Sequence, residues 1–367
     1  MSKKLYTIIV ATGSYVPPTV IPNSYFQDAE FYDPATGKKF ETSNEDIIRK
    51  FHEITNIEER RYAEPDQATS HLATFAALDA LESSGYDREK LDFIIAAHNF
   101  GDLYPGAFRS DICPAIANRV KTQLGIKNTH VFTHDVIAGC PGWTTAMIIA
   151  DAYIKSGLFK CGLVIGSDLN SRASDPFDRD RMIFSDGSGA VIVEATESKI
   201  PVGILSSASR SDIDPGMLKM GVSLNPDYQG TELNIRMLGH KVYAYALSAV
   251  PGVVKESLDK AGLHLTDIKK VLIHQANEKM DEAILHRVFK LYGIKEFNPD
   301  VMPMTIRTLG NSSTATVPTL LDLIVKNKME DHSIEPGDHI ILTSVGAGMV
   351  INSIVYRFPD NALFQED

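Results

Sequence analysis

Cys140 is the residue of this sequence best placed to act as a nucleophile. A run from Val131 to Val136 that indicates a buried strand leads up to it, and a helix-like run from Thr144 to Ser156 follows it. Pro141 suits a first helical position because its missing N–H would have no intrahelical partner there. The thiol is therefore expected at a helix N-terminus, where the macrodipole favours thiolate over thiol. The alternative is a small buried cysteine without a chemical role, which is the expected fate of Cys113 and Cys161.

A histidine and an asparagine later in the chain are candidate partners for this cysteine. His274 closes an apolar, strand-like run and precedes a helix expected from about Glu278, while Asn311 lies in a tight turn that opens into another helix. Turns that leave the ends of strands carry functional groups in open α/β sheets. Histidine moves protons near neutral pH, and an amide can hydrogen-bond a carbonyl without titrating. Taken singly, a hydrogen-bonded strand-end histidine and an asparagine helix cap explain the two residues equally well.

The composition excludes several classes of protein. The chain has 367 residues and a formal net charge of −11, which argues against nucleic acid as its main partner. Its three cysteines favour a reducing compartment over a disulfide framework. The apolar run from Leu5 to Val10 is too short for a signal sequence, and no stretch approaches a membrane-spanning length. We expect a soluble cytoplasmic protein, and because His130 and His134 lie in a strand-like segment, we expect no metal site.

Two segments of the chain repeat the same order of elements. Residues 76–98 and residues 253–274 each predict a helix, a glycine, a short charged turn and an apolar strand. Strands that alternate with helices and are almost continuously apolar are typical of parallel sheets. We therefore expect an α/β protein with two similar halves, residues 1–198 and residues 199–367, and a ligand site between them.

Two irregular stretches in the first half interrupt this order. Residues 23–61 contain a turn-rich insertion and then a helix expected from about Asn44 to Glu53, and residues 99–111 form a second loop rich in Gly, Tyr, Pro and Phe. Loops on a rigid scaffold are common sites of substrate selectivity. We expect the two insertions to shape what the site accepts.

The order and setting of these residues resemble the β-ketoacyl-acyl-carrier-protein synthase III family over essentially the whole chain. The resemblance rests on Cys140 in its strand-to-helix turn and on four further motifs, which are His274-Gln-Ala-Asn277, Gly310-Asn311, Phe184-Ser-Asp-Gly-Ser-Gly-Ala190 and Gly346-Ala-Gly348. It implies the thiolase fold, in which two duplicated βα half-domains have mixed sheets that sandwich central helices in αβαβα layers. It also implies a homodimer.

Other branches of the thiolase fold fit the sequence less well. A thiolase would need a second catalytic cysteine in the C-terminal half, but no cysteine follows Cys161. Elongating synthases of the other type use two histidines, where this chain has Asn311 as the second partner. Chalcone-synthase-like enzymes carry a Gly-Phe-Gly-Pro-Gly loop that this sequence lacks. The initiating, synthase III branch remains.

By this resemblance the reaction has two halves and needs no cofactor beyond its thioester substrates. The thiolate of Cys140 attacks an acyl-CoA or acyl-carrier thioester and holds the acyl group covalently. The backbone N–H groups of Cys140 and Ala347 receive the oxyanion. A malonyl-type thioester then loses CO2, and His274 and Asn311 stabilise the enolate that attacks the acyl group in a Claisen condensation.

Residues outside this centre are implicated in substrate and carrier binding. Arg172 aligns with a family arginine at the pantetheine and nucleotide entrance, and Asn277 belongs to the motif around His274. Lys279 and Arg287 align with basic positions that dock an acidic acyl carrier protein. For the two basic residues a solvated helix face is the alternative interpretation, although an acidic enzyme needs a local basic patch to bind an acidic partner.

Two positions depart from the family pattern. Asp46 stands where the family has a tryptophan that stacks on adenine, so coenzyme A is expected to be a poorer acyl donor than a carrier protein. Cys113 stands where the family usually has a bulky aromatic that caps the partner's acyl pocket, so we expect room for a longer or bulkier acyl group. The departures leave fatty-acid initiation open alongside two specialised reactions, dialkylresorcinol-type condensation of β-ketoacyl thioesters and acyl transfer without condensation.

A different class of enzyme shares the order of Cys, His and Asn. Papain-like cysteine hydrolases have these residues in the same sequence order, with the histidine well over a hundred residues downstream. The long ordered segment before Cys140, the internal duplication and the lack of disulfide cysteines argue against a hydrolase. In a hydrolase Asn311 would orient the histidine, whereas in a ketosynthase it would contact the substrate. A catalytically inactive scaffold subunit is disfavoured by the complete set of three residues.

Overall fold

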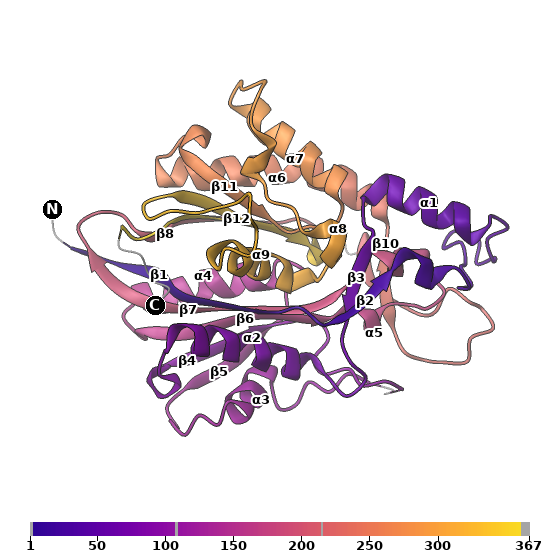
Figure 1. Cartoon of the computed structure of the whole chain (residues 1–367), viewed down its shortest axis with the longest axis horizontal. Helices are drawn as coiled ribbons and strands as arrows, with labels where there is room; N and C mark the ends of the chain where they lie inside the picture. Colours follow the sequence, from indigo (N-terminus) through magenta and orange to yellow (C-terminus); the bar gives the residue numbers. More distant parts are fainter. Residues whose placement is uncertain (1–2, 107–108, 214–215, 361–367) are drawn as a thin grey trace.

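Helices and sheets alternate in five layers. The structure, a computed structural model, describes residues 3–106, 109–213 and 216–360. Figure 1 shows helices on both outer sides, the sheets inside them and further helices between the sheets. This is the αβαβα arrangement expected from the resemblance, and the thiolase fold is confirmed.

The two sheets divide between the two parts of the chain. The first sheet has the order β1 (Lys4–Tyr15), β7 (Asp186–Ser198), β6 (Cys161–Leu169), β4 (Phe93–Ala97) and β5 (Phe132–Val136). The second has the order β11 (Ile268–Ile273), β12 (His339–Gly346), β13 (Val350–Arg357) and β8 (Gly203–Ser211). Both sheets are mixed. β4 runs parallel to β5 and β6, and β11 runs parallel to β12, while the other neighbouring strands are antiparallel.

The helices form the three remaining layers. The outer face of the first sheet is covered by α2 (Thr69–Ser84) and α3 (Ile116–Gln123), and that of the second by α6 (Gly239–Ala261) with α7 (Glu278–Leu291) packed beside it. Between the sheets lie α4 (Gly142–Lys155) and α9 (Thr316–Val325). Apolar side chains of both central helices join both sheets in one core, which includes Trp143, Met147 and Leu320. The helices that follow Cys140 and Asn311 therefore lie in the buried middle layer of the molecule.

The repeated order of elements expected from the sequence is present in both halves. α2 ends at Gly85 and α6 ends at Gly262, each glycine having a positive φ that a side chain would disfavour. A short 3-10 turn follows each glycine, and then β4 or β11. The turns Arg88–Lys90 and Leu265–Asp267 are the two charged turns of the sequence pattern.

Two glycines let helices pack directly on the first sheet. A Cβ on Gly13 of β1 would lie 2.3 Å from the carbonyl oxygen of Ala76 in α2, and a Cβ on Gly189 of β7 would lie 2.6 Å from the amide nitrogen of Thr319 in α9. Both distances are shorter than any ordinary contact, so these positions accept no side chain without moving a helix. The close packing fixes how far α9 lies from the sheet that also holds the cysteine loop.

The strand that precedes Cys140 is less buried than the sequence suggested. β5 was expected to be a buried strand, but its residues are half-buried and Phe132 is 48% exposed. The reason is its position at the edge of the first sheet, where only β4 pairs with it. The apolar pattern therefore predicted the strand correctly, but its prediction that the strand is buried is wrong.

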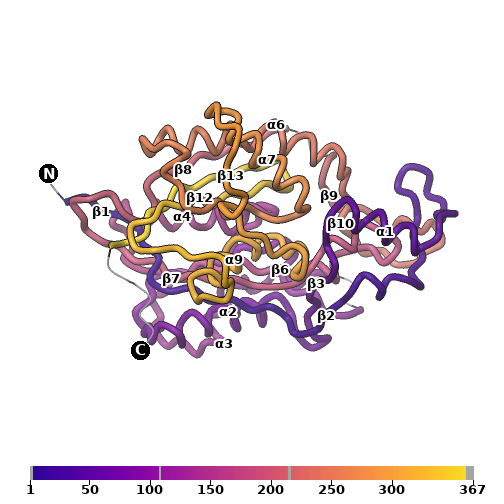
Figure 2. The backbone as a smooth tube through the Cα atoms, turned by 45° about the horizontal axis from the view of Figure 1, so that its top comes forward, coloured from indigo at the N-terminus to yellow at the C-terminus, as the bar shows by residue number. Residues whose placement is uncertain are grey.

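The insertion at residues 23–61 forms a separate unit at one end of the molecule. It contains α1 (Asn44–Thr55), as expected, and the start of β3 (Glu59–Tyr62), which pairs with β2 (Thr19–Pro22). In Figure 2 α1 lies beside β10 (Asn234–Met237), which pairs with β9 (Leu218–Gly221). Among the described residues no helix is long and apolar enough to cross a membrane.

Candidate active site

Cys140 lies in a five-residue turn between β5 and α4. Gly139 has a φ of +63°, and its carbonyl oxygen accepts a hydrogen bond from the amide of Gly142 at 2.9 Å. Pro141 is the N-cap of α4, and its carbonyl oxygen accepts the amide of Thr145 at 2.8 Å. The strand-to-helix position predicted for the cysteine is therefore confirmed.

The backbone after β12 lies directly against this turn. A Cβ on Gly346 would come within 2.8 Å of the amide nitrogen of Cys140, and a Cβ on Gly139 within 2.7 Å of the amide nitrogen of Ala347. An oxyanion hole made of the Cys140 and Ala347 amides requires this close approach of two backbone segments. The role of the two amides stays a prediction, and the contact that it needs is present.

Ser313 is the point at which the cysteine, the histidine and the asparagine meet. Its hydroxyl donates to Sγ of Cys140 at 3.4 Å, and its amide donates to Oδ1 of Asn311 at 2.8 Å. The Ser313 backbone lies close enough to the ring of His274 to raise its pKa. Three residues from distant parts of the chain thus surround one serine, which sequence reasoning did not identify. The only sequence signal for Ser313 was its position two residues after Asn311. In the structure it lies in a turn and has a φ of +56°.

His274 and Asn311 are both buried and both retain hydrogen-bonding capacity. Their exposed fractions are 2% and 3%. Nδ1 of His274 has no hydrogen-bond partner among the described residues, which is unusual for a buried polar atom. The Asn311 side chain accepts through Oδ1, and within the described part of the chain its Nδ2 donates to no residue. Each side chain therefore keeps a nitrogen that no described residue satisfies.

Burial shifts the pKa of the cysteine and that of the histidine in opposite directions. Desolvation raises the pKa of the Cys140 thiol to about 11, and the negative charge of Asp168 adds to this rise, while the Ser313 hydroxyl opposes it. Desolvation also lowers the pKa of His274 to about 4. The sequence predicted a lowered thiol pKa at the helix N-terminus, and that direction is wrong because burial penalises the thiolate more than nearby N–H groups stabilise it. Both groups are neutral at pH 7.

A second residue missed by sequence reasoning, Gln275, positions the chain that leads to Asn311. The Gln275 side chain is fully buried. Its Nε2 donates to the carbonyl oxygen of Pro303 at 2.8 Å, and its Oε1 accepts from the amides of Thr305 at 2.8 Å and Ile306 at 2.9 Å. These three bonds tie the strand end at His274 to the segment that enters α8 (Ile306–Leu309). Gln275 therefore fixes His274 and the Asn311 turn relative to each other.

The remaining candidate residues lie apart from Cys140, and their roles stay predictions. Asn277 caps α7, since its Oδ1 accepts the amide of Met280 at 3.1 Å. Arg172 donates to the backbone carbonyls of Glu64, Gln67 and Leu103, so it holds two loops together.

The two basic residues of α7 and the third cysteine have structural contacts of their own. Nζ of Lys279 donates to the carbonyl oxygen of Glu53 in α1, and the Arg287 guanidinium donates to that of Leu247 in α6 at 3.1 Å. Cys161 is buried as expected, but Cys113 is exposed, so the expectation of a small buried cysteine is wrong there. Cys113 lies outside the helices and strands and precedes a cis peptide bond to a proline. Lys279 and Arg287 thus share one helix, as a carrier-docking surface would require, and Cys113 lies at the second irregular loop.

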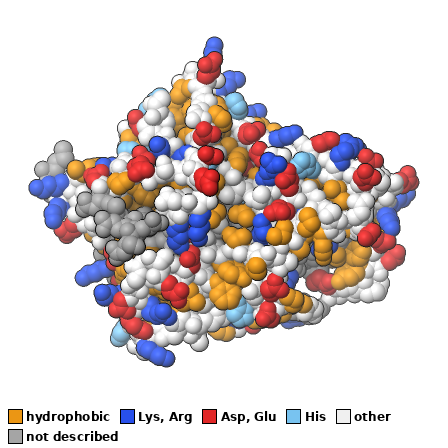
Figure 3. Space-filling model, in the orientation of Figure 1, with side chains coloured by type: hydrophobic (Ala, Val, Ile, Leu, Met, Phe, Trp, Pro, Cys, Tyr) orange, Lys and Arg blue, Asp and Glu red, His pale blue; other side chains and the backbone are white. Residues whose placement is uncertain are grey.

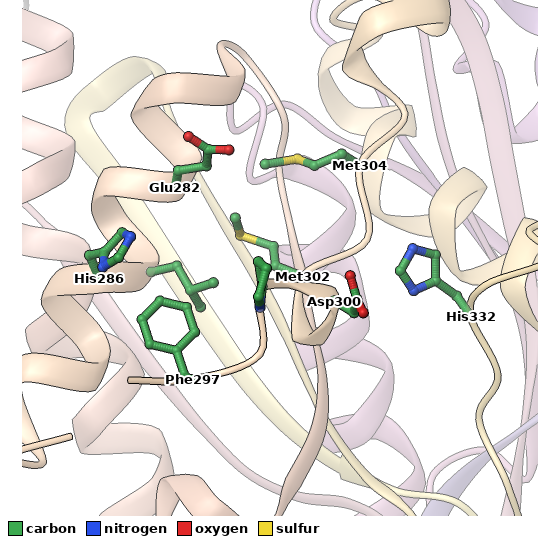
Figure 4. A pocket seen from close by; sticks show the side chains of 9 residues that line it. Glu282, His286, Phe297, Asp300, Met302, Met304 and His332 are labelled. Carbon is green, nitrogen blue, oxygen red and sulfur yellow. The ribbon is translucent and has the colours of Figure 1, made fainter. Parts of the chain in front are cut away.

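A surface hollow on the outer side of α7 contains none of the predicted site residues. It has a volume of about 400 Å³. Figure 4 shows Glu282 and His286 on one wall, with Phe297, Met302 and other side chains of the segment before α8 facing them. No group of three or more His, Cys, Asp or Glu among the described residues is arranged to hold a metal ion.

Comparison with known proteins identifies the family. Two family models match the chain, 3-oxoacyl-[acyl-carrier-protein (ACP)] synthase III over residues 134–212 and its C-terminal counterpart over residues 258–358. β-Ketoacyl-[acyl-carrier-protein] synthase III 1 of Vibrio vulnificus is 34% identical over 357 residues, which cover 96% of this chain and 100% of that protein. The chain belongs to the 3-oxoacyl-acyl-carrier-protein synthase III family.

Solved structures of this family agree with that membership. The synthase III of Thermus thermophilus matches with a TM-score of 0.79 and 29% identity over 96% of this chain and 100% of that one. The priming β-ketosynthase of the R1128 polyketide pathway matches with a TM-score of 0.78 over 98% of each chain, and at 24% identity it shows the fold alone. The chain is thus a condensing acyltransferase of the synthase III family, and the papain-like alternative is excluded.

Proposed function

We propose that this chain condenses an acyl thioester with a malonyl-type thioester of a carrier protein, through an acyl intermediate on Cys140. The observation that carries the proposal is the meeting of Cys140, His274 and Asn311 around Ser313. Membership of the synthase III family supports it, because the relatives are named for 3-oxoacyl-acyl-carrier-protein synthesis.

In the first half-reaction Cys140 takes the acyl group from its donor. Sγ forms a bond to the thioester carbon while the thiol proton leaves, and the carbonyl oxygen becomes an oxyanion next to the Cys140 and Ala347 amides. The intermediate collapses by breaking the bond to the donor sulfur, and the donor thiolate takes up a proton. Because the pKa of Cys140 is about 11, the thiol needs a base during attack. His274, with a pKa of about 4, is too weak a base to keep that proton, so the proton passes to the departing donor sulfur.

In the second half-reaction His274 and Asn311 bind the malonyl-type thioester oxygen. Loss of CO2 leaves the electron pair of the broken C–C bond as an enolate, whose negative charge lies largely on that oxygen. His274 and Asn311 are buried and neutral, and they stabilise this charge through hydrogen bonds. A positively charged group in their place would also bind the carboxylate of the malonyl group and oppose its loss as CO2. The enolate carbon then attacks the acyl carbonyl, Cys140 leaves as thiolate, and a β-ketoacyl thioester is formed.

The acyl donor that we propose is a carrier protein rather than coenzyme A. Asp46 lies exposed in the first turn of α1, where it forms an ion pair with Arg49 at 3.0 Å. A carboxylate at this position repels the phosphates of a nucleotide and offers no ring for stacking. Figure 3 shows acidic and basic side chains interspersed over one face of the molecule. This chain has a formal net charge of −11, so it needs local cations to bind an acidic carrier protein. Lys279 and Arg287 on α7 are the candidates for these cations.

We further propose that the protein is a cytoplasmic homodimer that pairs along the edge of the first sheet. β5 is the edge strand, and large apolar side chains at and beside it are exposed, with 48% for Phe132 and 64% for Ile137. An exposed edge strand with apolar side chains favours pairing with a second copy. In this arrangement the region of Cys113 lies near the partner, as the acyl-pocket role expected for that residue requires.

Intact mass spectrometry tests the proposed function. Wild-type protein, Cys140→Ser and the matched control Cys113→Ser are each incubated with acyl-CoA and acyl-carrier thioesters of increasing chain length. We expect an acyl adduct on wild type and Cys113→Ser, none on Cys140→Ser, and faster loading from the carrier. Addition of a malonyl-carrier thioester should discharge the adduct and release a β-ketoacyl product.

Other outcomes of this experiment would replace the proposal. Discharge only by a β-ketoacyl thioester would indicate dialkylresorcinol-type condensation, and discharge by an alcohol or amine would indicate acyl transfer without condensation. An adduct that also forms on Cys140→Ser, or no adduct with any donor, would contradict the covalent intermediate.

A further inference from the structure

A buried carboxylate that the proposed reaction does not use lies behind the site. Asp168, at the end of β6, is 1% exposed. Oδ1 accepts the amide of Asn99 at 2.8 Å, and Oδ2 accepts Nδ2 of Asn99 at 2.8 Å. Oδ2 also accepts the amide of Thr314 at 3.1 Å and its hydroxyl at 2.8 Å. Four donors from two segments thus hold one carboxylate in place.

Asn99 connects this carboxylate to Ser313. Its Nδ2 donates to Oδ2 of Asp168 and also to Oγ of Ser313, the second bond being 2.9 Å long. An amide nitrogen has two hydrogens, so both are used. The carboxylate fixes which end of the Asn99 side chain faces Ser313, because an amide oxygen in that place would face Asp168 and be repelled.

The hydrogen of the Ser313 hydroxyl is therefore directed at the cysteine. A serine hydroxyl has one hydrogen to donate, and Oγ already accepts from Asn99. The Asp168 carboxylate also interacts with this hydroxyl, which lowers the pKa of Asp168. The contact within hydrogen-bond distance runs from Oγ to Sγ of Cys140 at 3.4 Å, so the hydrogen is assigned to the sulfur. The serine backbone is held on both sides, since its own amide donates to Asn311 and the next amide, that of Thr314, donates to Asp168.

We propose that Ser313 is a positioning residue whose hydroxyl stabilises the thiolate of Cys140, and that Asn99 and Asp168 fix the direction of its hydrogen. The thiolate appears when Cys140 attacks and again when the condensed product leaves, and at both points it gains a hydrogen bond that is already in place. The direction of the electrostatics agrees, because the Ser313 hydroxyl lowers the thiol pKa while the Asp168 charge raises it. Asp168 thus contributes by orienting Asn99 and, through it, the Ser313 hydroxyl. Its own negative charge has the opposite effect, because it disfavours the thiolate.

The inference rests on Cys140 being the nucleophile but needs no acyl substrate for its test. The rate of Cys140 alkylation by iodoacetamide is measured from pH 6 to 11, with peptide mass spectrometry to separate it from Cys113 and Cys161. Because the pKa of Cys140 is about 11, a change in the midpoint is read from the displacement of the rate profile along the pH axis. Ser313→Ala and Ser313→Gly remove the hydroxyl, and glycine suits the positive φ of this position. We expect both to slow alkylation about tenfold at pH 7.5 and to raise the midpoint by about one pH unit.

Two further variants complete the test. Asn99→Ala should shift the midpoint in the same direction by a smaller amount, about threefold in rate, because the hydroxyl remains but loses its fixed direction. Ser312→Ala is the matched control, since the Ser312 hydroxyl contacts Thr316 at 3.4 Å and not the cysteine. It should leave the midpoint unchanged.

The outcomes separate the two proposals. A reactive Cys140 whose midpoint is the same in wild type and in both Ser313 variants overturns the inference and leaves the proposed function standing. A midpoint that moves equally in Ser312→Ala also overturns it, because the shift would then report a general loosening of the turn. A Cys140 that alkylates no faster than buried Cys161 at any pH overturns the proposed function, and the inference with it.

Discussion

At the residue scale, His274 shows how strongly burial controls the chemistry of the site. The imidazole is uncharged at every pH at which the protein is expected to work, because its pKa is about 4. A charged imidazole would bind the carboxylate of a malonyl group and oppose its loss. Neutrality favours a role in which the ring donates a hydrogen bond to an enolate.

The same burial gives folding a pH dependence that His274 controls. Above about pH 6.5 the ring is neutral in the folded and the unfolded chain and contributes no pH dependence. Between pH 6.5 and 4 only the unfolded chain binds the proton, so the free energy of unfolding falls by about 3 kcal/mol as pH falls. In urea titrations from pH 7 to 4, wild type should lose about 3 kcal/mol more than His274→Asn. Equal losses would show that His274 is not the group that titrates.

Sequence reasoning identified some of these residues and missed others for a physical reason. Cys140, His274 and Asn311 were recognisable because each lies where a strand ends or a helix begins, and those ends are visible in local patterns. Asn99 and Asp168 act only through side-chain contacts across long stretches of chain. Asn99 meets Ser313 from 214 residues away. No local pattern encodes such a contact.

At the scale of elements, the loop after β12 and the start of α4 are fitted to each other. A side chain on Gly346 would overlap both the amide nitrogen and the Cβ of Cys140, at 2.8 and 2.9 Å. Gly346→Ala should therefore push the Ala347 amide away from the thioester oxygen and slow acyl loading by about 10²–10³-fold. Rapid-quench measurement of adduct formation checks this. Gly252→Ala on α6, where a Cβ meets nothing within 4 Å, is the control and should load normally.

α7 contains a carboxyl group whose burial costs stability. Asp281 is fully buried, neither carboxyl oxygen has a hydrogen-bond partner among the described residues, and burial raises its pKa well above the ordinary value. In the unfolded chain the group ionises above about pH 4, so the cost to folding grows as pH rises through that value.

Asp281→Leu should therefore stabilise the protein at neutral pH. We expect a gain of about 1–3 kcal/mol in the free energy of unfolding at pH 7, and a smaller gain at pH 4. Chemical denaturation at the two pH values measures it, with Glu282→Gln on the exposed side of the same helix as a control within about 0.5 kcal/mol of wild type. A loss of stability would mean that the carboxyl group has a stabilising partner.

The elements themselves were partly predictable. The helix, glycine, turn and strand before Ala97 and before His274 follow from apolar periodicity and glycine punctuation, which are local signals. β9 and β10 were not foreseen, because each has only four residues, too few for an alternating pattern to indicate a strand. They are held instead by Arg236, which contacts the buried carboxylates of Asp175 and Asp178 some 60 residues earlier in the chain.

At the scale of the whole molecule, the two sheets are joined tightly enough to act as one body. The hydroxyl of Tyr356 in β13 accepts the amide of Ile9 in β1 at 2.8 Å, across 347 residues of sequence. Asp322 of α9 accepts the hydroxyls of Thr12 and Ser14 from the first sheet. The site between the sheets therefore has rigid walls on both sides.

Association of two copies is tested at the exposed edge of the first sheet. Phe132→Glu places a charge on β5 and should convert the proposed dimer to a monomer, because burial of an unpaired carboxylate at the interface is unfavourable. Light scattering coupled to size exclusion measures the mass. Ile200→Glu, at a residue 57% exposed in the turn between β7 and β8, should leave the dimer intact. A dimeric Phe132→Glu protein would place the interface elsewhere.

The separation between the cysteine and the serine that contacts it has a consequence for biosynthesis. Cys140 and Ser313 are 173 residues apart. At about 5–20 residues per second, a ribosome adds the serine roughly 9–35 s after the cysteine. Throughout that interval the nascent chain carries its thiol without the histidine, the asparagine or the serine. A prematurely terminated chain that ends before β11 would thus display the cysteine as an ordinary thiol, open to oxidation but unable to condense thioesters.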